Sequence, residues 1–359
     1  MILRKQKNTT LHPQLKLQRG LSLIELMIAI TLGLVVIAGV GTAYLGGKQS
    51  YRVNENLSRM QENARYAFDI LSKEIRMAGY YGCASSDVTV VNTLNNASNY
   101  AWDFTQAIYG FESIDATTWS PSLPSSGSPQ YGPASPLGGS DIVVVRSIMG
   151  NGTRVLQHPG GTPPGSADLK VTVDSGIVEG DILMVADCQG AAIFQATDVN
   201  TSGGFDNTVH NTGSLAGMIP GNATQNFGRE FVGAELIKLA TRTYYIRNNA
   251  SGVPALYRVV GAGASEEMVE GIEGMQVLYG VDETGDFAAN SYHDASWVDS
   301  NARWPNVVSA QIQLLVRSPD NNLVNAAQTY KFNGANVTAA DRRLRQVFTS
   351  TIALRNRTF

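Results

Sequence analysis

The feature that most constrains this chain is a run of 22 residues without a charged side chain, from Leu26 to Gly47. At about 1.5 Å of rise per residue, a helix of this length spans roughly 33 Å, which exceeds a hydrocarbon core of about 30 Å. No proline interrupts residues 21–78, so nothing in the sequence forces the helix to end with the run. The run therefore predicts a membrane-spanning helix near the N-terminus.

Charge is distributed unevenly on the two sides of this run. Five basic residues and no acid precede it within residues 1–20, namely Arg4, Lys5, Lys7, Lys16 and Arg19. The remaining residues carry 22 basic and 30 acidic side chains, although the formal charge of the whole chain is only −3. The positive-inside rule then predicts a cytoplasmic N-terminus and export of everything after Lys48. The acidic bulk argues against direct binding of nucleic acid.

The sequence after the run predicts a continued helix rather than a signal-peptide cleavage site. An ordinary signal peptide would place a small-residue A-x-A site here, and "GGKQSYRVNENL" matches it poorly. Instead, apolar residues recur every three or four positions and form one stripe on a helix. They are Leu57, Met60, Ala64, Ala67, Leu71, Ile75 and Ala78, and Gly79 supplies a stop signal. This stripe requires a soluble body to cover it.

Glu25 places a carboxylate at the threshold of the apolar run. Such a group costs a few kcal/mol inside the hydrocarbon edge, and it is usually functional or paired. One interpretation is that Glu25 reaches the headgroups at the helix start, where the helix dipole favours an acid. In the other, a cut after Gly20 creates an α-amine on Leu21, and this amine pairs with Glu25 of a neighbouring subunit. The residues alone leave both interpretations open.

The exported part reads as strands separated by long loops. Buried-strand patterns begin at "SDIVVVRSIMG", "ADLKVTVDSG" and "GDILMVADC". Residues 120–140 and 201–228 are poor in apolar side chains and rich in turn formers, which predicts loops, insertions or a linker between two domains.

The C-terminal third has a clearer sheet pattern. Alternating apolar residues mark "MQVLYGV", "NVVSAQIQLLVRS" and "QVFTSTIALRN", and "TRTYYIR" leads through "NNASG" to "ALYRVV" as a hairpin. Four or five such strands predict one antiparallel sheet, whose apolar face would be covered by the stripe of residues 57–78.

The segment "RG-LSLIELMIAITLGLVVIAGV" resembles the class III signal of type IV prepilins and type II secretion pseudopilins. The resemblance implies cleavage after Gly20 by prepilin peptidase, N-methylation of Leu21, and pairing of Glu25 with the N-terminal amine of another subunit. Two departures are Leu21, where Phe is commonest, and Thr42, near which many major pilins have a proline. Small residues four apart, Gly39, Ala43 and Gly47, form a face suited to close helix packing.

Four later segments, "RMAGYYGC", "ADCQGAAIFQAT", "IEGMQVLYGVD" and "RQVFTSTIALRNR", resemble the PilW family of large minor pilins. The implied fold is α+β and pilin-like: a long N-terminal helix packed on an antiparallel β-sheet with long loop insertions. The implied organisation is a cleaved leader at 1–20, a transmembrane and assembly helix at 21–47, its amphipathic continuation at 48–79, and an exported β-rich domain at 80–359.

The same resemblance implies a minor pilin that helps initiate type IV pilus assembly, joins a tip complex and supports twitching motility, adhesion or DNA uptake. Its implied partners are prepilin peptidase, other minor pilins, the major pilin, a tip adhesin and, before assembly, the inner membrane. The implied topology is a single pass with a periplasmic C-terminal domain. The alternatives are a J-type minor pseudopilin of a type II secretion system, which the length of the chain disfavours, and a membrane-tethered enzyme or carbohydrate binder.

The sequence contains two cysteines, Cys83 and Cys188. An even pair in an exported domain predicts a disulfide, with two buried thiols as the alternative. Such a bridge would close a loop of about 100 residues and contribute up to roughly 4.7 kcal/mol on the chain-entropy model.

No catalytic constellation is recognisable, and we expect no enzyme activity, metal or cofactor. The four histidines, His12, His158, His210 and His293, lack zinc-like spacing, and neither a G-x-S-x-G nor a P-loop motif occurs. The acid-rich stretch 282–299 has oxygen ligands of the kind that calcium uses but no recognised loop spacing, so we expect a solvated loop.

Overall fold

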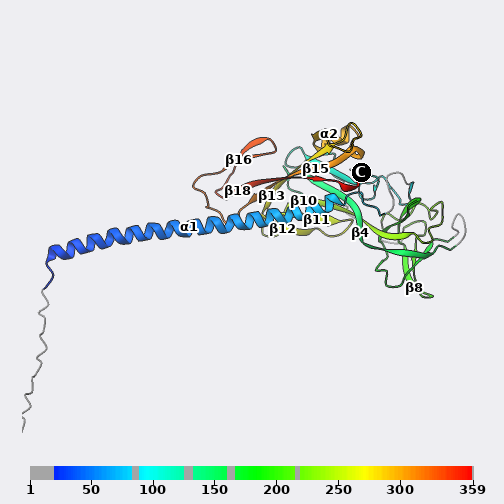
Figure 1. Ribbon diagram of the computed structural model, residues 1–359, viewed down its shortest axis with the longest axis horizontal. Helices are drawn as coiled ribbons and strands as arrows, with labels where there is room; N and C mark the ends of the chain where they lie inside the picture. Colours follow the sequence, from blue (N-terminus) through cyan, green and yellow to red (C-terminus); the bar gives the residue numbers. More distant parts are fainter. Residues whose placement is uncertain (1–19, 83–88, 125–131, 160–165, 215–218, 358–359) are drawn as a thin grey trace, which may run out of the picture. The chain divides into compact units, whose positions relative to one another are not determined.

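The computed structural model describes residues 20–82, 89–124, 132–159, 166–214 and 219–357 (Figure 1). By its internal contacts the chain divides into two units, Met1–Asn54 and Glu55–Phe359. The helix α1 (Leu23–Arg76) begins in the first unit and ends in the second. The sequence predicted this helix to within three residues at either end.

In the second unit, α1 buries the predicted stripe. Its buried apolar residues are Met60, Ala64, Ala67, Leu71 and Ile75, followed by Ala78 just after the helix. The prediction was wrong at the start of the stripe, where Leu57 is only half-buried and Asn56 takes the buried position. The Asn56 amide is satisfied there because its Nδ2 donates to Asp320 Oδ2 at 3.3 Å and its Oδ1 accepts the Asp320 N–H at 3.2 Å.

The helix ends where the sequence placed its stop. Gly79 adopts a positive φ of 70°, a conformation that favours glycine over other residues. Its N–H donates to the backbone oxygen of Arg146 at 2.9 Å, which ties the end of α1 to a strand of the larger sheet.

The larger sheet has 12 strands. Its main path is β1-β7-β6-β10-β4-β5-β9-β8, with β11 and β12 added beside β10, and β2 and β3 beside β4. Only the pairing of β1 with β7 is parallel among the described strands. The strands are β1 (Val90–Asn92), β2 (Ile108–Ser113), β3 (Trp119–Ser120), β4 (Ile142–Gln157), β5 (Asp168–Val171), β6 (Ile182–Asp187), β7 (Gly190–Gln195), β8 (Asp198–Ser202), β9 (Phe205–Val209), β10 (Glu235–Asn248), β11 (Pro254–Val260) and β12 (Glu266–Glu270).

A second sheet has four antiparallel strands in the order β14-β13-β15-β18. These are β13 (Ile272–Val281), β14 (Ser291–His293), β15 (Val307–Arg317) and β18 (Arg345–Ala353). A separate hairpin joins β16 (Thr329–Phe332) to β17 (Ala335–Thr338). Short helical segments are α2 (Ala295–Ser300), η1 (Trp304–Asn306) and η2 (Arg355–Arg357).

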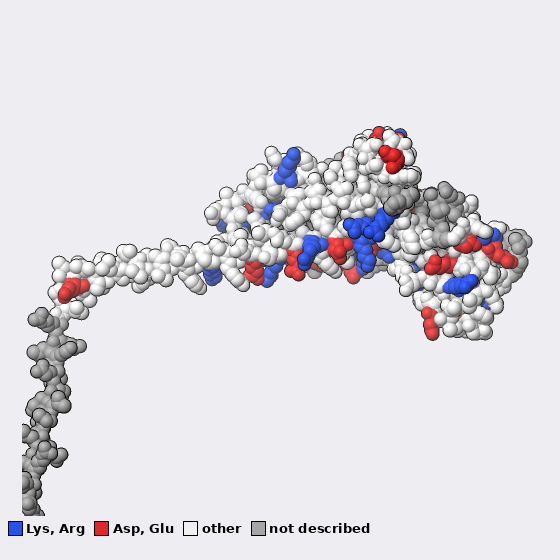
Figure 2. All heavy atoms as spheres, viewed as in Figure 1, with Lys and Arg blue, Asp and Glu red and all other residues white. Residues whose placement is uncertain are grey.

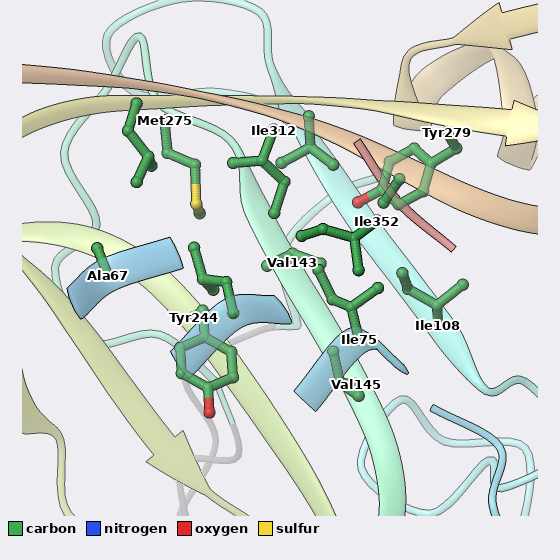
Figure 3. Packing of buried hydrophobic residues seen from close by; sticks show 14 of the residues in the cluster. Ala67, Ile75, Ile108, Val143, Val145, Tyr244, Met275, Tyr279, Ile312 and Ile352 are labelled. Atoms are coloured by element: carbon green, nitrogen blue, oxygen red, sulfur yellow. The ribbon is translucent and has the colours of Figure 1, made fainter. Parts of the chain in front are cut away.

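The main core joins the stripe on α1 to both sheets, as Figure 3 shows in close view. Ala67 and Ile75 of α1 meet Val143 and Val145 of β4 and Tyr244 of β10 in one cluster. The same cluster contains side chains of the smaller sheet, including Met275, Tyr279, Ile312 and Ile352. The predicted α+β architecture, a long N-terminal helix whose later part packs on a mostly antiparallel β-domain, is therefore confirmed.

Strand membership differs from the prediction in one respect. The hairpin β10–β11 forms as expected, but it belongs to the larger sheet and not to the sheet of β13, β15 and β18. The reason is the length of β10, whose 14 residues pair with β4 and with β6 in addition to β11. Alternating hydrophobicity indicates which face of a strand is buried, but not which strand lies beside it.

Two segments predicted as loops contain regular structure. Residues 201–228 include β9, which pairs with β5 and, across a turn at Gly203 and Gly204, with β8. The acid-rich stretch 282–299 contains β14 and the start of α2, for which Asp294 is the N-cap. Both escaped prediction because they contain few apolar residues with a clear period.

Candidate assembly site

The start of α1 is a capping box built by Ser22 and Glu25. The Ser22 backbone N–H and its Oγ each donate to Glu25 Oε2 at 2.9 Å, and the Glu25 N–H donates to Ser22 Oγ at 3.2 Å. This reciprocal pairing satisfies two of the N–H groups that a helix start leaves without a partner. It also holds the Glu25 carboxylate against the backbone N–H of Ser22, so Glu25 serves as a helix-start acid within a single chain.

Between Glu25 and Lys48, α1 carries no charged side chain. An 18-residue window reaches a mean hydropathy of 2.6, and none of it is buried. The hydroxyls of Thr31 and Thr42 donate to backbone oxygens of their own helix, at 2.8 Å to Met27 and 2.9 Å to Gly39. Figure 2 shows this part of the helix as a stretch without blue or red. The helix is thus long and apolar enough to cross a membrane, and its exposed surface requires lipid or other helices as a partner.

The predicted packing face lies within this stretch. Gly39 and Gly47 have no atom within 4 Å of the place where a Cβ would stand, and Ala43 between them is exposed. Another helix could approach the backbone closely along this face. Gly20, directly before the capping box, is equally open, whereas residues 1–19 lie outside the part of the chain that the structure describes.

Cys188, one of the two residues of the predicted disulfide, lies at the turn between β6 and β7. The only other cysteine of the sequence, Cys83, lies outside the described residues. The turn is held by Asp187, whose Oδ1 and Oδ2 accept hydrogen bonds from the Arg229 guanidinium at 2.9 and 2.8 Å. This contact ties the position of Cys188 to a segment more than 40 residues further along the chain.

Two histidines without an assigned role are part of an apolar core. His210 is fully buried and stacks on Phe227, with ring centroids 4.1 Å apart. His158 accepts the Phe231 N–H on Nδ1 at 3.2 Å. Burial lowers the pKa of His210 to about 3 and lowers that of His158 as well, so both rings are neutral near pH 7.

The carboxylates of the acid-rich stretch are engaged within the fold. Asp282 accepts backbone N–H groups from Thr284, Gly285 and Phe287, and Asp299 accepts the Tyr109 hydroxyl at 2.9 Å. Within the described ranges, no group of three His, Cys, Asp or Glu side chains is placed to hold a metal ion.

A carboxyl pair, with Asp141 buried and Glu112 half-buried, links the two sheets, and no motif in the sequence indicated it. Asp141, directly before β4, accepts the Ser113 N–H of β2 at 3.0 Å and the Val277 N–H of β13 at 2.9 Å. Glu112 of β2 is hydrogen-bonded to Asp141. Burial, reinforced by the charges of Asp141 and Asp294, raises the pKa of Glu112 to about 8, and burial raises the pKa of Asp141 to about 7. The pair therefore retains a proton near neutral pH.

Comparison with models of known protein families identifies the family of this chain. The model of the prokaryotic N-terminal methylation motif matches residues 15–41, and the model of PilW, the type IV pilus-assembly protein W, matches residues 243–356. The chain is a PilW-type pilin. The first match contains Gly20, Leu21 and Glu25, and the second extends from β10 through the smaller sheet. No curated protein and no solved structure matches the chain.

The match to the PilW model covers only some of the segments that resemble PilW in the sequence. Of the four quoted PilW-like segments, "IEGMQVLYGVD" and most of "RQVFTSTIALRNR" lie within the matched range, whereas "RMAGYYGC" and "ADCQGAAIFQAT" precede it. A PilW-type pilin with a methylation motif is a minor pilin related to the type IV pilus, a structural protein anchored through its apolar helix. Membership also implies processing by prepilin peptidase and pilin partners.

Proposed function

We propose that this minor pilin helps initiate assembly of a type IV pilus and is incorporated into the fibre as part of a tip complex. The observation that carries the proposal is the combination of a class III signal with an uncharged, wholly exposed helix directly behind it. None of the most apolar 18-residue window of that helix is buried within the described part of the chain, and the helices of other pilins have the matching composition. The large β-rich body favours the tip, where no subunit has to pack beyond it.

The proposal assigns a role to each part of the N-terminal segment. Residues 1–20 are a cytoplasmic leader that prepilin peptidase removes after Gly20, and Leu21 becomes the N-methylated first residue. Residues 21–47 span the inner membrane and later pack in the fibre through Gly39, Ala43 and Gly47. Residues 48–79 continue the helix, and residues 80–359 form the periplasmic domain.

Glu25 has the central role in assembly. The capping box uses only Ser22 and Glu25, and both remain after cleavage, so the carboxylate stays bound to the residue next to the new N-terminus. We propose that it pairs there with the α-amine of another subunit as the chain leaves the membrane. An opposite charge in a low-dielectric surrounding offsets part of the cost of keeping a carboxylate out of water.

The proposed partners are the major pilin, other minor pilins and a tip adhesin, in addition to prepilin peptidase and the inner membrane before assembly. Twitching motility, adhesion and DNA uptake are the pilus-dependent functions that such a role would support. The proposed disulfide between Cys83 and Cys188 would stabilise the exported domain on this pathway.

Deletion of the gene in a strain that carries both a type IV pilus and a type II secretion system tests the proposal. Surface pili should fall strongly in number while secretion of a type II substrate stays at the wild-type level. Complementation with the wild-type chain should restore piliation, and complementation with a Gly20→Val variant should not. Loss of secretion with normal piliation would instead identify a J-type pseudopilin.

A further inference from the structure

The last strand of the smaller sheet, β18, has an open edge. Among the described strands it pairs only with β15, in register from Ser309 with Ala353 to Arg317 with Arg345 and without a bulge. Leu354 N–H donates to the Val308 oxygen at 2.9 Å. Because bonded and non-bonded pairs alternate along an antiparallel ladder, the even-numbered residues of β18 bond to β15. The odd-numbered residues direct their N–H and C=O groups outward.

The contacts of Gln328 confirm this parity. Its side chain accepts the Arg345 N–H at 2.9 Å and donates to the Arg345 oxygen at 2.8 Å, so the outward backbone groups of this odd-numbered residue are covered. In the described part of the chain, no hydrogen bond covers the outward backbone groups of the four odd-numbered residues that follow, Val347, Thr349, Thr351 and Ala353. An open row of alternating donors and acceptors remains.

This edge lacks the usual protection against pairing. Edge strands are normally blunted by charges, prolines or bulges, and residues 346–353, "QVFTSTIA", contain none of them. The end strand β12 of the larger sheet is different, because it carries Glu266, Glu267 and Glu270 within five residues. The edge at β12 is therefore protected by charge, whereas the edge at β18 is neutral.

A groove of about 530 Å³ lies over the outer face of the sheet beside this edge. The sheet lines it with the polar side chains of Gln276, Gln311, Gln313 and Thr349 and the apolar ones of Leu278 and Val347, and the β16–β17 hairpin adds Lys331, Asn333 and Gly334. Its amide and hydroxyl groups can donate to and accept from polar side chains of an incoming segment, and Leu278 and Val347 offer apolar contact. Lys331 brings the only charge to this lining, so the groove suits a mostly neutral strand.

We propose that a β-strand of another pilin subunit pairs with the outward edge of β18 and extends the four-stranded sheet. Only an extended backbone offers donors and acceptors that alternate with the required spacing along several residues. Subunits anchored in one membrane by similar apolar helices would meet at high local concentration, which favours such pairing. This inference rests on the proposed function, because it takes the partner from among the assembling pilins.

Proline at position 349 tests the edge selectively. Its N–H points outward, so Thr349→Pro removes an open donor without removing a bond to β15, and proline is tolerated at such edge positions. Thr349→Val, which keeps the N–H, is the matched control. We expect Thr349→Pro to be cleaved and to accumulate in membranes like the wild-type chain. Its recovery with other pilins, identified by mass spectrometry after affinity purification of the full-length chain, should fall about tenfold or more.

Three outcomes would overturn parts of this reasoning, and they are distinguishable. Wild-type recovery of Thr349→Pro would contradict strand addition at β18 but leave the proposed function intact. Absence of other pilins from the wild-type preparation would contradict the proposed function itself. Two differently tagged copies that co-purify only when Thr349 is present would show self-pairing instead of a different pilin.

If Thr349→Pro fails to accumulate, hydrogen exchange of the wild-type chain tests strand pairing at β18 instead. In the isolated wild-type chain, the Thr349 and Thr351 amides should exchange quickly and the Ser350 amide slowly, because only Ser350 donates within the sheet. All three should exchange slowly in the complex with other pilins. Fast exchange of Thr349 and Thr351 in that complex would contradict the proposal.

Discussion

Replacing Glu112 with glutamine should abolish a loss of stability that the wild-type protein shows between pH 7 and pH 8. Glu112, which is half-buried, and Asp141, which is buried, share a site between β2, β4 and β13, and Asp294 at the start of α2 adds a third charge nearby. The hydroxyl of Tyr279 also faces this pair, but its pKa is raised further above 10, so it stays neutral. The proton retained by the carboxyl pair is therefore the one that titrates.

The wild-type stability falls as the pH rises because both pKa values are higher in the native state than in the unfolded chain. Burial raises the native pKa of Glu112 from its usual 4.5 to about 8 and that of Asp141 from 3.8 to about 7. The native state thus holds a proton that the unfolded chain has released. The resulting stability is complete below about pH 4 and is lost as the pH rises through the native pKa values. For one group with a pKa of 8, integration from pH 7 to pH 8 gives a loss of about 1 kcal/mol.

Histidines with lowered pKa values act in the opposite direction at lower pH. His210, with a pKa of about 3, and His158 are neutral when folded but bind protons in the unfolded chain below about pH 6.5. Their contribution to stability rises as the pH increases through 6.5 and levels off about one pH unit above it. Because Glu112→Gln and the wild-type chain contain the same histidines, the difference between these two proteins from pH 7 to pH 8 isolates the carboxyl pair.

Urea unfolding of the full-length protein in detergent, followed by tryptophan fluorescence at pH 7 and pH 8, measures the effect. The wild-type free energy of unfolding should fall by about 1 kcal/mol across this interval, and that of Glu112→Gln should change by less than about 0.3 kcal/mol. Glu179→Gln, which changes an exposed carboxylate, should behave like the wild-type chain. An equal fall in Glu112→Gln and wild type would refute the assignment of the proton to this pair.

Three further predictions concern the core, the cysteines and the leader. Leu71→Ala, at a fully buried position of α1, should lower the free energy of unfolding in urea by about 2–5 kcal/mol. Tyr66→Ala, on the exposed side, should lower it by less than about 0.5 kcal/mol. Equal losses would contradict the packing of the stripe. If Cys83 and Cys188 are bridged, gel mobility should differ with and without reductant, and labelling of both thiols in the unfolded, unreduced protein would reject the bridge. Gly20→Val should keep its leader in N-terminal mass spectrometry, and a mature chain of normal length from this variant would contradict cleavage at Gly20.

Local patterns explain why much of the assembly site could be predicted. The basic leader, Gly20, Glu25 and the uncharged run all lie within one continuous segment, and each acts through its immediate neighbours. The capping box was missed, although the serine and glutamate of "SLIE" stand three residues apart at a helix start, which is the spacing that favours it. The helix stripe was predictable because its period depends on helix geometry alone.

Features that depend on distant partners could not be predicted in this way. Asn56 is buried because Asp320, 264 residues away, satisfies its amide. The shared proton of Glu112 and Asp141 requires strands from both sheets to meet, and the larger sheet recruits β10 through pairings with two other strands. The open edge of β18 likewise follows from the strand order and not from its own sequence, which reads as an ordinary strand.

The most direct test of the proposed assembly role is the amount of Glu25→Ala protein in sheared pili, with cleavage and membrane insertion measured in the same cells. Because Glu25 also caps the helix, Ser22→Ala is the matched control, which weakens the cap but keeps the carboxylate. If Glu25 pairs with the amine of another subunit, Glu25→Ala should be cleaved and inserted normally yet be strongly depleted from pili. Glu25→Asp should be intermediate, and Ser22→Ala should be close to wild type. Wild-type levels of Glu25→Ala in pili, or equal depletion of Ser22→Ala, would show that Glu25 is only a helix-start acid.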